Sequence, residues 1–372
     1  MKQMIGLGLL LFAATGVLPG AVTGFTPFAP EGDTFIHDPS TIVQDGACYY
    51  VFGTGPGIRS KSSSDLRHWT NGPAVFRPLP AWTFRTVPGF RGYCWAPDVL
   101  RVGRKFLLYY AVSTWGKQVS AIGLATNPTL DPSAKNYHWT DCGPVLVSTN
   151  GSPFNAIDPS VFQDDDGTLW LAFGSYWRGI YLTELNPQTG QRLTADSPLY
   201  PLAWNDSIEA ACLTRHGKYY YLFVNWGQCC RGTNSTYEIR VGRAEKITGP
   251  YLDRDGKNML DGGGTPFLQS HGRFIGPGHL GIIHGHTPDG ATWFSFHYYD
   301  ADTAGRPRLA LGRIDWSSGW PVPVNAGISS AGAATNNRRL VRPDEFNVNG
   351  PSNPAHRTLE DGFTPNQERE RH

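Results

Sequence analysis

Five acidic or histidine side chains open similar phrases along the chain, and such side chains act as proton donors and acceptors when they lie together. Asp38 opens "DPST", Asp98 "DVLR", Asp158 "DPSV", Glu209 "EAAC" and His279 "HLGI". One Asp-Pro pair is normally a turn signal, but a turn at each site would not explain five in the same setting. If the fold gathers them, neighbouring charge keeps one carboxyl protonated while another stays ionised. That asymmetry predicts general acid–base catalysis.

The segments that follow these residues form a weak internal repeat. Each has a polar anchor, a short apolar run, a turn containing Gly and a strongly aromatic run, as in "DPSTIVQDGACYYVFGT" and "DPSVFQDDDGTLWLAFGS". A third strand-like run such as "GIYLTELNP" follows, and no helical periodicity competes. We therefore predict an all-β fold, a five-bladed β-propeller whose inner strands bring the anchors to the mouth of a central channel. Two β-sandwiches are the alternative, but the equivalence of the anchors argues against them.

Composition narrows the class of partner. The 372 residues contain 32 Lys and Arg against 31 Asp and Glu, and the basic residues are scattered, so a nucleic-acid partner is not expected. Aromatic residues reach 13%, with 12 Trp and 16 Tyr, and Gly (44) and Pro (29) are abundant. This profile is typical of short strands joined by many turns, and of surfaces that stack on carbohydrate.

The two ends of the chain differ from its middle. Residues 1–24 have one early Lys, an apolar run and small residues, the pattern of a secretory signal peptide rather than a membrane anchor. The repeats fill residues 25–323, which we assign to the catalytic domain. Residues 324–372 contain few aromatic residues and are expected to form an extended or disordered tail. We expect a secreted (extracellular or periplasmic) monomer with no membrane partner.

Six cysteines lie after the predicted signal peptide, at positions 48, 94, 142, 212, 229 and 230. Six allow about 15 complete pairings, and the sequence does not choose among them. No C-x-x-C pair of the zinc type is present. The adjacent pair at 229–230 is unusual, although buried small apolar side chains would also explain cysteines.

Glycoside hydrolysis is one reaction that needs two carboxyl groups on either side of the broken bond, one protonated and one ionised. In inverting enzymes they stand roughly 6.5–9.5 Å apart, which leaves room for the attacking water. Asp38 and Glu209 fall in non-adjacent repeats, so they could reach this separation across a channel mouth. Asp158 falls in the repeat next to Glu209 and could tune its affinity for a proton.

Several phrases in collinear order resemble glycoside hydrolase family 43, and most of all its endo-1,5-α-L-arabinanases. They are "IHDPS", "WAPDV", "AIDPSVF", "FGSYWRGI", "IEA", "CCRGTNSTYEIRVGRAEKITGPYLDRDGKNMLDGGGT" and "GPGHLG", spread over residues 30–322. The resemblance implies a five-bladed propeller and an inverting mechanism, with Asp38 as general base, Glu209 as general acid and Asp158 as the residue that raises the pKa of Glu209. It also implies a metal ion, usually Ca²⁺, beside His279 on the axis, and no organic cofactor.

Aromatic and polar residues near the anchors are candidates for sugar binding. Trp95 precedes Asp98 by three residues and could stack on a sugar ring. Trp115 and Trp177 occupy similar places in later segments, although most Trp of a propeller pack between blades. Asn155 and Ser175 are candidate partners for sugar hydroxyls, and each could equally close a turn.

The expected substrate is arabinan, the side chain of plant pectin, cut internally. An exo-acting α-L-arabinofuranosidase or β-xylosidase of the same family is the first alternative, because the carboxyls do not distinguish a groove from a pocket. A non-catalytic carbohydrate-binding propeller is the second, and the presence of all three carboxyls argues against it. The phrase "IEAAC" differs from the "IEGP" common in arabinanases, which puts substrate contacts near Glu209 in question.

Overall fold

The structure is a computed structural model that describes residues 25–326. Regular structure in this range is almost entirely β, with one short helix, α1 (Ala81–Thr86), and three 3-10 turns, η1 (Gly232–Asn234), η2 (Met259–Asp261) and η3 (Ala301–Thr303). The predicted all-β class is confirmed. The predicted signal peptide and almost all of the predicted tail lie outside the described residues. No helix within residues 25–326 has the length and apolar character needed to cross a membrane.

The strands form five consecutive groups, each with four strands paired antiparallel in chain order. Group 1 contains β2 (Ile42–Asp45), β3 (Cys48–Gly53), β5 (Arg59–Ser63) and β6 (His68–Asn71). Group 2 contains β7 (Tyr93–Val102), β8 (Lys105–Val112), β9 (Ser120–Asn127) and β10 (Thr140–Ser148). Group 3 contains β11 (Ser160–Gln163), β12 (Leu169–Phe173), β13 (Ile180–Leu185) and β14 (Tyr200–Ala203).

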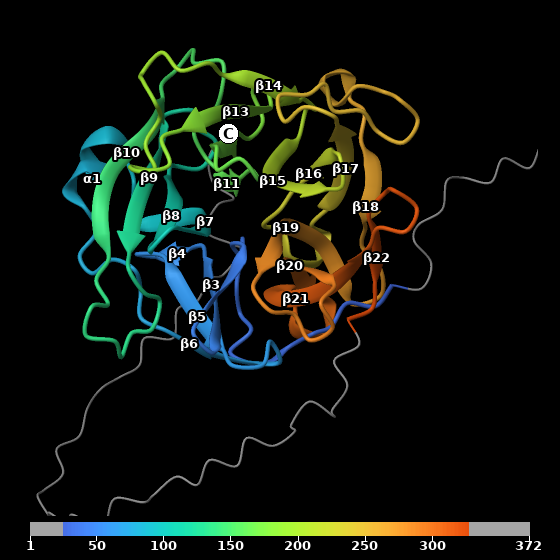
Figure 1. Cartoon of the computed structure of the whole chain (residues 1–372), viewed down its shortest axis with the longest axis horizontal. Coiled ribbons are helices and arrows are strands. Elements are labelled where there is room, and N and C mark those ends of the chain that lie inside the picture. The colour runs from blue at the N-terminus through green and yellow to red at the C-terminus, as the bar shows by residue number, and fades with distance from the viewer. Residues whose placement is uncertain (1–24, 327–372) are drawn as a thin grey trace, which may run out of the picture.

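Group 4 contains β15 (Ile208–His216), β16 (Tyr219–Trp226), β17 (Glu238–Ala244) and β18 (Thr265–Leu268). Group 5 contains β19 (Phe274–His284), β20 (Thr292–Asp300), β21 (Arg306–Asp315) and β22 (Val322–Val324). Two short strands extend the sheets: β1 (Glu31–Gly32) pairs with β6, and β4 (Gly55–Pro56) pairs with β7. The groups lie side by side in a ring, with β7, β11, β15 and β19 toward its centre (Figure 1).

The first and last groups are joined directly. β2 pairs in parallel with β19 through Ile42 and Ile283, so groups 1 and 5 form one nine-stranded sheet. The chain before β2 also bridges to β21, where Phe28 pairs with Leu311. Contacts between the start and the end of the described chain therefore close the ring.

Five apolar clusters hold the groups together, one at each junction between neighbours. β8 shows why its sequence suits this position. Phe106 and Leu108 pack toward group 1, while Leu107 and Tyr109 pack toward group 3. Successive side chains of a strand point to opposite faces, so a strand buried on both faces needs an unbroken apolar run, here "FLLYY".

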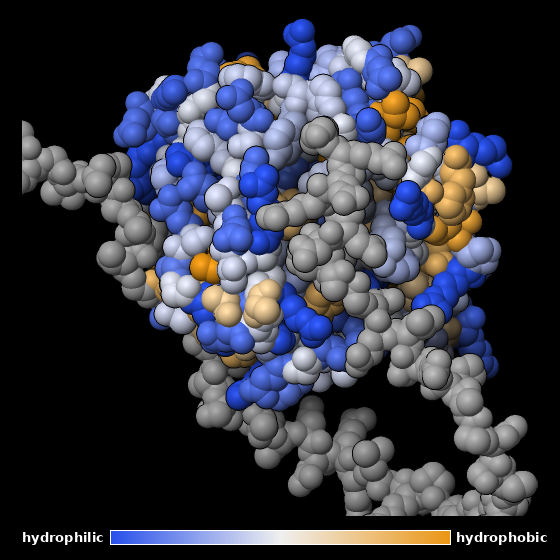
Figure 2. All heavy atoms as spheres, turned by 180° about the vertical axis from the view of Figure 1, so that it is seen from behind, coloured by the Kyte–Doolittle hydropathy of each residue, from blue (hydrophilic) through white to orange (hydrophobic). Residues whose placement is uncertain are grey.

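The part of one face that is coloured in Figure 2 is mainly polar. Figure 2 shows one face, on which small hydrophobic patches are separated by hydrophilic residues.

Each group begins with one non-glycine residue in the left-handed region. These anchor residues are Asp38 (φ 49°), Ala96 (40°), Asp158 (53°), Ala210 (53°) and His279 (56°). The structure corrects two of the sequence-based anchors. Asp98 lies two residues after the left-handed residue of its group, Ala96, and Glu209 lies one residue before that of its group, Ala210. In "WAPD" it is the Ala-Pro pair, and not the Asp, that corresponds to the Asp-Pro pairs of groups 1 and 3.

The backbone amides of four anchors are held by side chains of the preceding group. Their acceptors are Thr54 Oγ1 for Ala96 (2.9 Å), Asp158 Oδ2 for Ala210 (3.1 Å), Asn225 Oδ1 for His279 (2.9 Å) and His297 Nδ1 for Asp38 (3.2 Å). Left-handed conformations cost energy in non-glycine residues and persist only where their surroundings fix them. These hydrogen bonds supply that constraint and fix the position of each inner strand relative to the preceding group.

Asp98 is a buried bridge between groups rather than a member of the central carboxyl cluster. Its carboxylate accepts the backbone N–H of Thr41 at 2.9 Å and that of Val161 at 2.8 Å. One side chain of group 2 thus satisfies amides at the inner strands of both neighbouring groups.

Replacing Asp98 with Ala should lower the free energy of unfolding by about 2–4 kcal/mol, because two buried amides lose their acceptor. Asp98→Asn, which keeps one acceptor oxygen, should lose less. Denaturant titration of the two variants against the parent chain measures both changes. A loss below about 0.5 kcal/mol for Asp98→Ala would contradict the bridging role.

Candidate active site

Asp38 is an ionised carboxylate surrounded by histidines. Its Oδ2 accepts from Thr54 Oγ1 at 2.6 Å and lies 2.8 Å from His37 Nδ1. Its Oδ1 lies 3.7 Å from His279 Nδ1 and 3.8 Å from His297 Nδ1. Burial alone would raise the pKa of Asp38, but the charge and hydrogen bond of His37 outweigh it, so the pKa lies below its usual range. Asp38 can therefore accept a proton at neutral pH.

His37 owes its state to the same contact. Burial lowers its pKa, and the charge and hydrogen bond of Asp38 more than compensate, so the pKa is raised overall. Its second nitrogen, Nε2, lies 2.7 Å from Tyr299 Oη. Tyr299 also accepts the backbone N–H of Cys230 at 2.7 Å, so His37 is held from both sides.

Glu209 is buried next to the anchor of group 4. Ser175 Oγ donates to its Oε2 at 2.7 Å, and Tyr237 Oη donates to its Oε1. Burial raises the pKa of Glu209 to about 7; the Ser175 hydrogen bond acts against this rise, and the charge of Asp38 adds to it. Glu209 can therefore hold a proton near neutral pH and release it.

Asp158 is the third buried carboxyl of the cluster. Burial raises the pKa of Asp158 well above its ordinary value, and the charges of Glu209 and Asp38 raise it further. Its Oδ2 accepts the backbone N–H of Ala210, the residue after Glu209. Two buried carboxyls beside an ionised third hold protons as a coupled pair, because ionising both in this place is unfavourable. The sequence predicts that Asp158 raises the pKa of Glu209, and this stays a prediction. In the structure, burial and then the charge of Asp38 are the principal causes that raise this pKa.

Two neutral histidines complete the cluster. Burial lowers the pKa of His279, and burial together with His37 lowers that of His297 well below its ordinary value. His297 Nδ1 accepts the N–H of Asp38, so its proton is on Nε2, for which the described residues offer no hydrogen-bond partner. His279 offers a neutral imidazole beside Asp38; such a nitrogen suits transition metals, whereas Ca²⁺ takes oxygen ligands.

The predicted sugar-binding residues differ in how they are presented. Trp95 is half-buried against Trp115, with ring centroids 6.3 Å apart, and Trp115 is 57% exposed. Trp177 is 41% exposed and has a left-handed backbone. Ser175 contacts Glu209 directly, whereas Asn155 is buried, and its Oδ1 has no hydrogen-bond partner among the described residues.

Sequence reasoning missed several members of the site, although a signal for some of them existed. In each repeat a polar residue lies in the second half of the aromatic second strand or within two residues of its end: Thr54, Ser113, Ser175, Asn225 and His297. Four of these bind a carboxyl or an anchor amide in the centre, as described above. His37, Tyr237 and Tyr299 had no repeat to reveal them.

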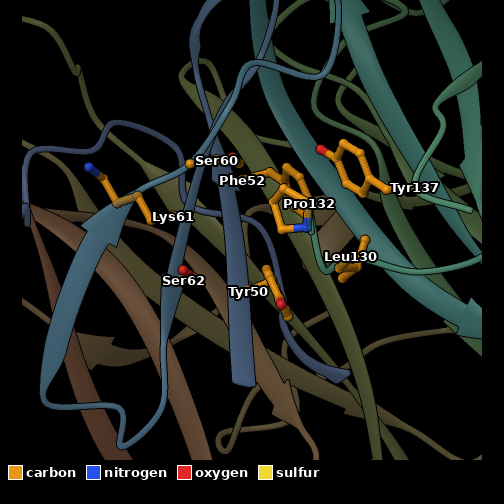
Figure 3. A pocket seen from close by; sticks show the side chains of 9 residues that line it. Tyr50, Phe52, Ser60, Lys61, Ser62, Leu130, Pro132 and Tyr137 are labelled. Atoms are coloured by element: carbon orange, nitrogen blue, oxygen red, sulfur yellow. The ribbon is translucent and has the colours of Figure 1, made fainter. Parts of the chain in front are cut away.

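A separate small cavity lies away from these carboxyls, between groups 1 and 2. Its lining includes Tyr50, Leu130, Pro132 and Tyr137, and the amine of Lys61 points away from the aromatic side chains (Figure 3). Lys61 Nζ donates to Asn71 Oδ1 at 2.5 Å. The described lining of this cavity contains no Asp, Glu, His or Cys, so the central carboxyl cluster is the better candidate for acid–base catalysis.

Comparison with known proteins agrees with a carboxyl-based hydrolase. Residues 29–321 match the family described as "Glycosyl hydrolases family 43". This chain belongs to that family. It is accordingly a glycoside hydrolase, and its predicted family resemblance is confirmed.

Two relatives and one solved structure are similar to this chain over most of its length. The chain is 39% identical over 328 residues to "Extracellular endo-alpha-(1->5)-L-arabinanase 1" of Bacillus subtilis (strain 168), over 86% of this chain and 97% of the relative. It is 38% identical over 306 residues to "Extracellular exo-alpha-(1->5)-L-arabinofuranosidase ArbA" of Cellvibrio japonicus (strain Ueda107), a match that covers 77% of this chain and 85% of the relative. The solved structure of Cellvibrio cellulosa alpha-L-arabinanase complexed with arabinohexaose superposes with a TM-score of 0.73 at 38% identity, covering 78% of this chain and 95% of that one.

If Glu209 is the general acid that the sequence predicts, the rate of this glycoside hydrolase should fall as pH rises through about 7, because only protonated Glu209 can donate. Ser175→Ala removes a hydrogen bond that favours ionised Glu209, so it should move this limb of kcat/KM upward by roughly half to one pH unit. Ser113→Ala, at the same position of the second repeat but bonded to Ser120, is the matched control and should leave the limb in place. A downward shift in Ser175→Ala would contradict the assignment.

Proposed function

We propose that this protein is a secreted inverting endo-α-1,5-L-arabinanase. One observation carries the proposal: a buried cluster holds one carboxyl ionised, Asp38, and another protonatable near neutral pH, Glu209. Glycoside hydrolysis requires this combination in both inverting and retaining enzymes, and the inverting course is what the family resemblance implies. The arabinan substrate is supported by the printed names of the relatives and by the arabinohexaose complex.

In the proposed mechanism Asp38 and Glu209 act at the same time. Asp38 takes a proton from a water molecule as the water oxygen attacks the anomeric carbon. Glu209 gives its proton to the glycosidic oxygen, and the bond from that oxygen to the anomeric carbon breaks. His37, Thr54 and Asp158 would be positioning residues, the first two for Asp38 and the third for the segment of Glu209, through Ala210.

We also infer that the five strand groups are the blades of a five-bladed β-propeller. The ring of Figure 1, an apolar cluster at every junction and an anchor residue at the start of every group support this architecture. The alternative of two packed sandwiches would not produce five equivalent junctions.

An exo-acting arabinofuranosidase is the second candidate function, because one relative at 38% identity has that name. We favour endo cleavage because Trp115 and Trp177, from groups 2 and 3, are exposed rather than covered, as an open groove requires. The exposed rings would stack on sugars on either side of the cut bond.

Secretion, a monomeric state and a calcium site belong to the same proposal. The extracellular relatives support secretion, and the polar face of Figure 2 suits a monomer. The Ca²⁺ would lie beside His279, near Asp38, with oxygen ligands and water forming its shell. Such an ion would fix the axial end of the cluster, and its removal by a chelator should lower the midpoint of thermal unfolding; an unchanged midpoint would argue against it.

Debranched linear arabinan tests the function most simply. An endo-acting enzyme should release a ladder of short oligosaccharides, whereas arabinose as the sole product would establish the exo alternative. Product chromatography distinguishes the two. ¹H NMR of the first-formed anomer tests inversion, and initial retention of configuration would rule it out.

Substitutions of the two reacting carboxyls test their roles. Asp38→Asn and Glu209→Gln should each lower kcat by roughly 10²–10⁴-fold, because each removes a proton transfer in the transition state. Asp166→Asn, on the exposed turn between β11 and β12, is the matched control and should keep the parent rate. Near-normal activity of either cluster variant would refute the assigned role.

A further inference from the structure

A disulfide between adjacent cysteines lies against the catalytic cluster. Cys229 and Cys230 are bonded to each other and half-buried, in the segment that follows β16. Cys230 has a left-handed backbone (φ 67°), and its N–H donates to Tyr299 Oη at 2.7 Å. Its Sγ therefore lies 3.7 Å from His37 Nε2.

His37 connects this sulfur pair to Asp38. Its Nδ1 lies 2.8 Å from Asp38 Oδ2, which leaves Nε2 on the side of Tyr299 and the two sulfurs. Histidines that bind metals typically use one ring nitrogen for a carboxylate and the other for the ion. His37 Nε2 and both Sγ atoms lie within 4.8 Å of one another.

We propose that reduction of the Cys229–Cys230 disulfide opens a three-ligand site for a soft divalent cation, formed by both sulfurs and His37 Nε2. A phosphine with water can reduce it: the S–S bond breaks, two thiols form and the phosphine becomes its oxide. Cation binding then displaces three protons, two from the thiols and one from His37 Nε2. Thiolate and imidazole are the ligands that Zn²⁺ and Cd²⁺ prefer, and water can complete a fourth position.

Occupancy of this site should inhibit the enzyme. The cation takes Nε2 from Tyr299, so the ring leaves the position in which its Nδ1 holds Asp38 Oδ2 at 2.8 Å. Asp38 is then displaced from the attacking water, which slows proton removal. The inhibition depends on the proposed role of Asp38, but the binding itself does not.

The test uses the whole chain carrying Cys48→Ser and Cys142→Ser, since Cys142 is exposed and Cys48 half-buried, and both lie in other parts of the fold. After reduction with a phosphine and its anaerobic removal, two additional thiols should be titratable per chain. Cd²⁺ is then titrated while thiolate–Cd²⁺ charge-transfer absorption is recorded. One Cd²⁺ should bind per reduced chain and none per oxidised chain, with at least tenfold loss of arabinan hydrolysis, reversed by a chelator.

Two variants define the ligands. Cys229→Ser with Cys230→Ser should abolish the absorption band under reducing conditions. Tyr299→Phe removes the hydroxyl that competes for His37 Nε2, so it should tighten Cd²⁺ binding in the reduced chain by a fewfold or more. A merely disruptive change would weaken binding instead.

Several outcomes would overturn the proposal. They are the absence of additional thiols after reduction, equal Cd²⁺ binding by reduced and oxidised chains, and an unchanged band in the double serine variant. Cd²⁺ binding without loss of hydrolysis would refute the inhibition. If the chain did not hydrolyse arabinan at all, the absorption band would still decide the metal site, so failure of the proposed function is recognised separately.

Discussion

Three carboxyl groups buried at one end of a ring cannot all be ionised, and this constraint governs the structure. Asp38 keeps its charge chiefly because the charge and hydrogen bond of His37, whose Nδ1 lies 2.8 Å from its Oδ2, outweigh the effect of burial. Among the described residues Asp158 and Glu209 have no ion pair of this kind, so burial and the charge of Asp38 favour their protonated forms. A site with an ionised base and a protonated acid therefore follows from where His37 lies, and not from any difference between the carboxyl groups themselves.

The scaffold maintains that asymmetry through strained backbone and cross-group hydrogen bonds. Every group starts with a left-handed residue, and four of these residues donate their N–H to a side chain of the preceding group. Asp158 has a structural and a chemical part in this arrangement. It accepts the N–H of Ala210, and it also belongs to the carboxyl cluster. Because these hydrogen bonds position the segments that carry Asp38 and Glu209, loss of one of them would displace the proposed acid, Glu209, relative to the proposed base, Asp38.

Much of this arrangement could be predicted from sequence because it is repeated. The Asp-Pro pairs located Asp38 and Asp158, and the alternation of aromatic strands gave the all-β class. The predicted alignment of the repeats was wrong in groups 2 and 4. In group 2 the left-handed residue is Ala96 and not Asp98, and in group 4 it is Ala210, the residue after Glu209. His37, Tyr237 and Tyr299 contact the cluster through folding of distant segments, which no local pattern encodes. The vicinal cysteines were visible in the sequence, but their approach to His37 depends on a separation of 193 residues along the chain.

The central claim is that the buried carboxyls hold opposite protonation states, and it can be measured directly. The chain, labelled with ¹³C at the Asp and Glu carboxyls, is titrated by NMR, with Asp38→Asn and Glu209→Gln used to assign the resonances. The account predicts that the Asp38 resonance stays at the ionised position throughout the accessible acidic range, while that of Glu209 titrates near pH 7. If both resonances titrated together near the ordinary carboxyl range of about 4, the account would be contradicted.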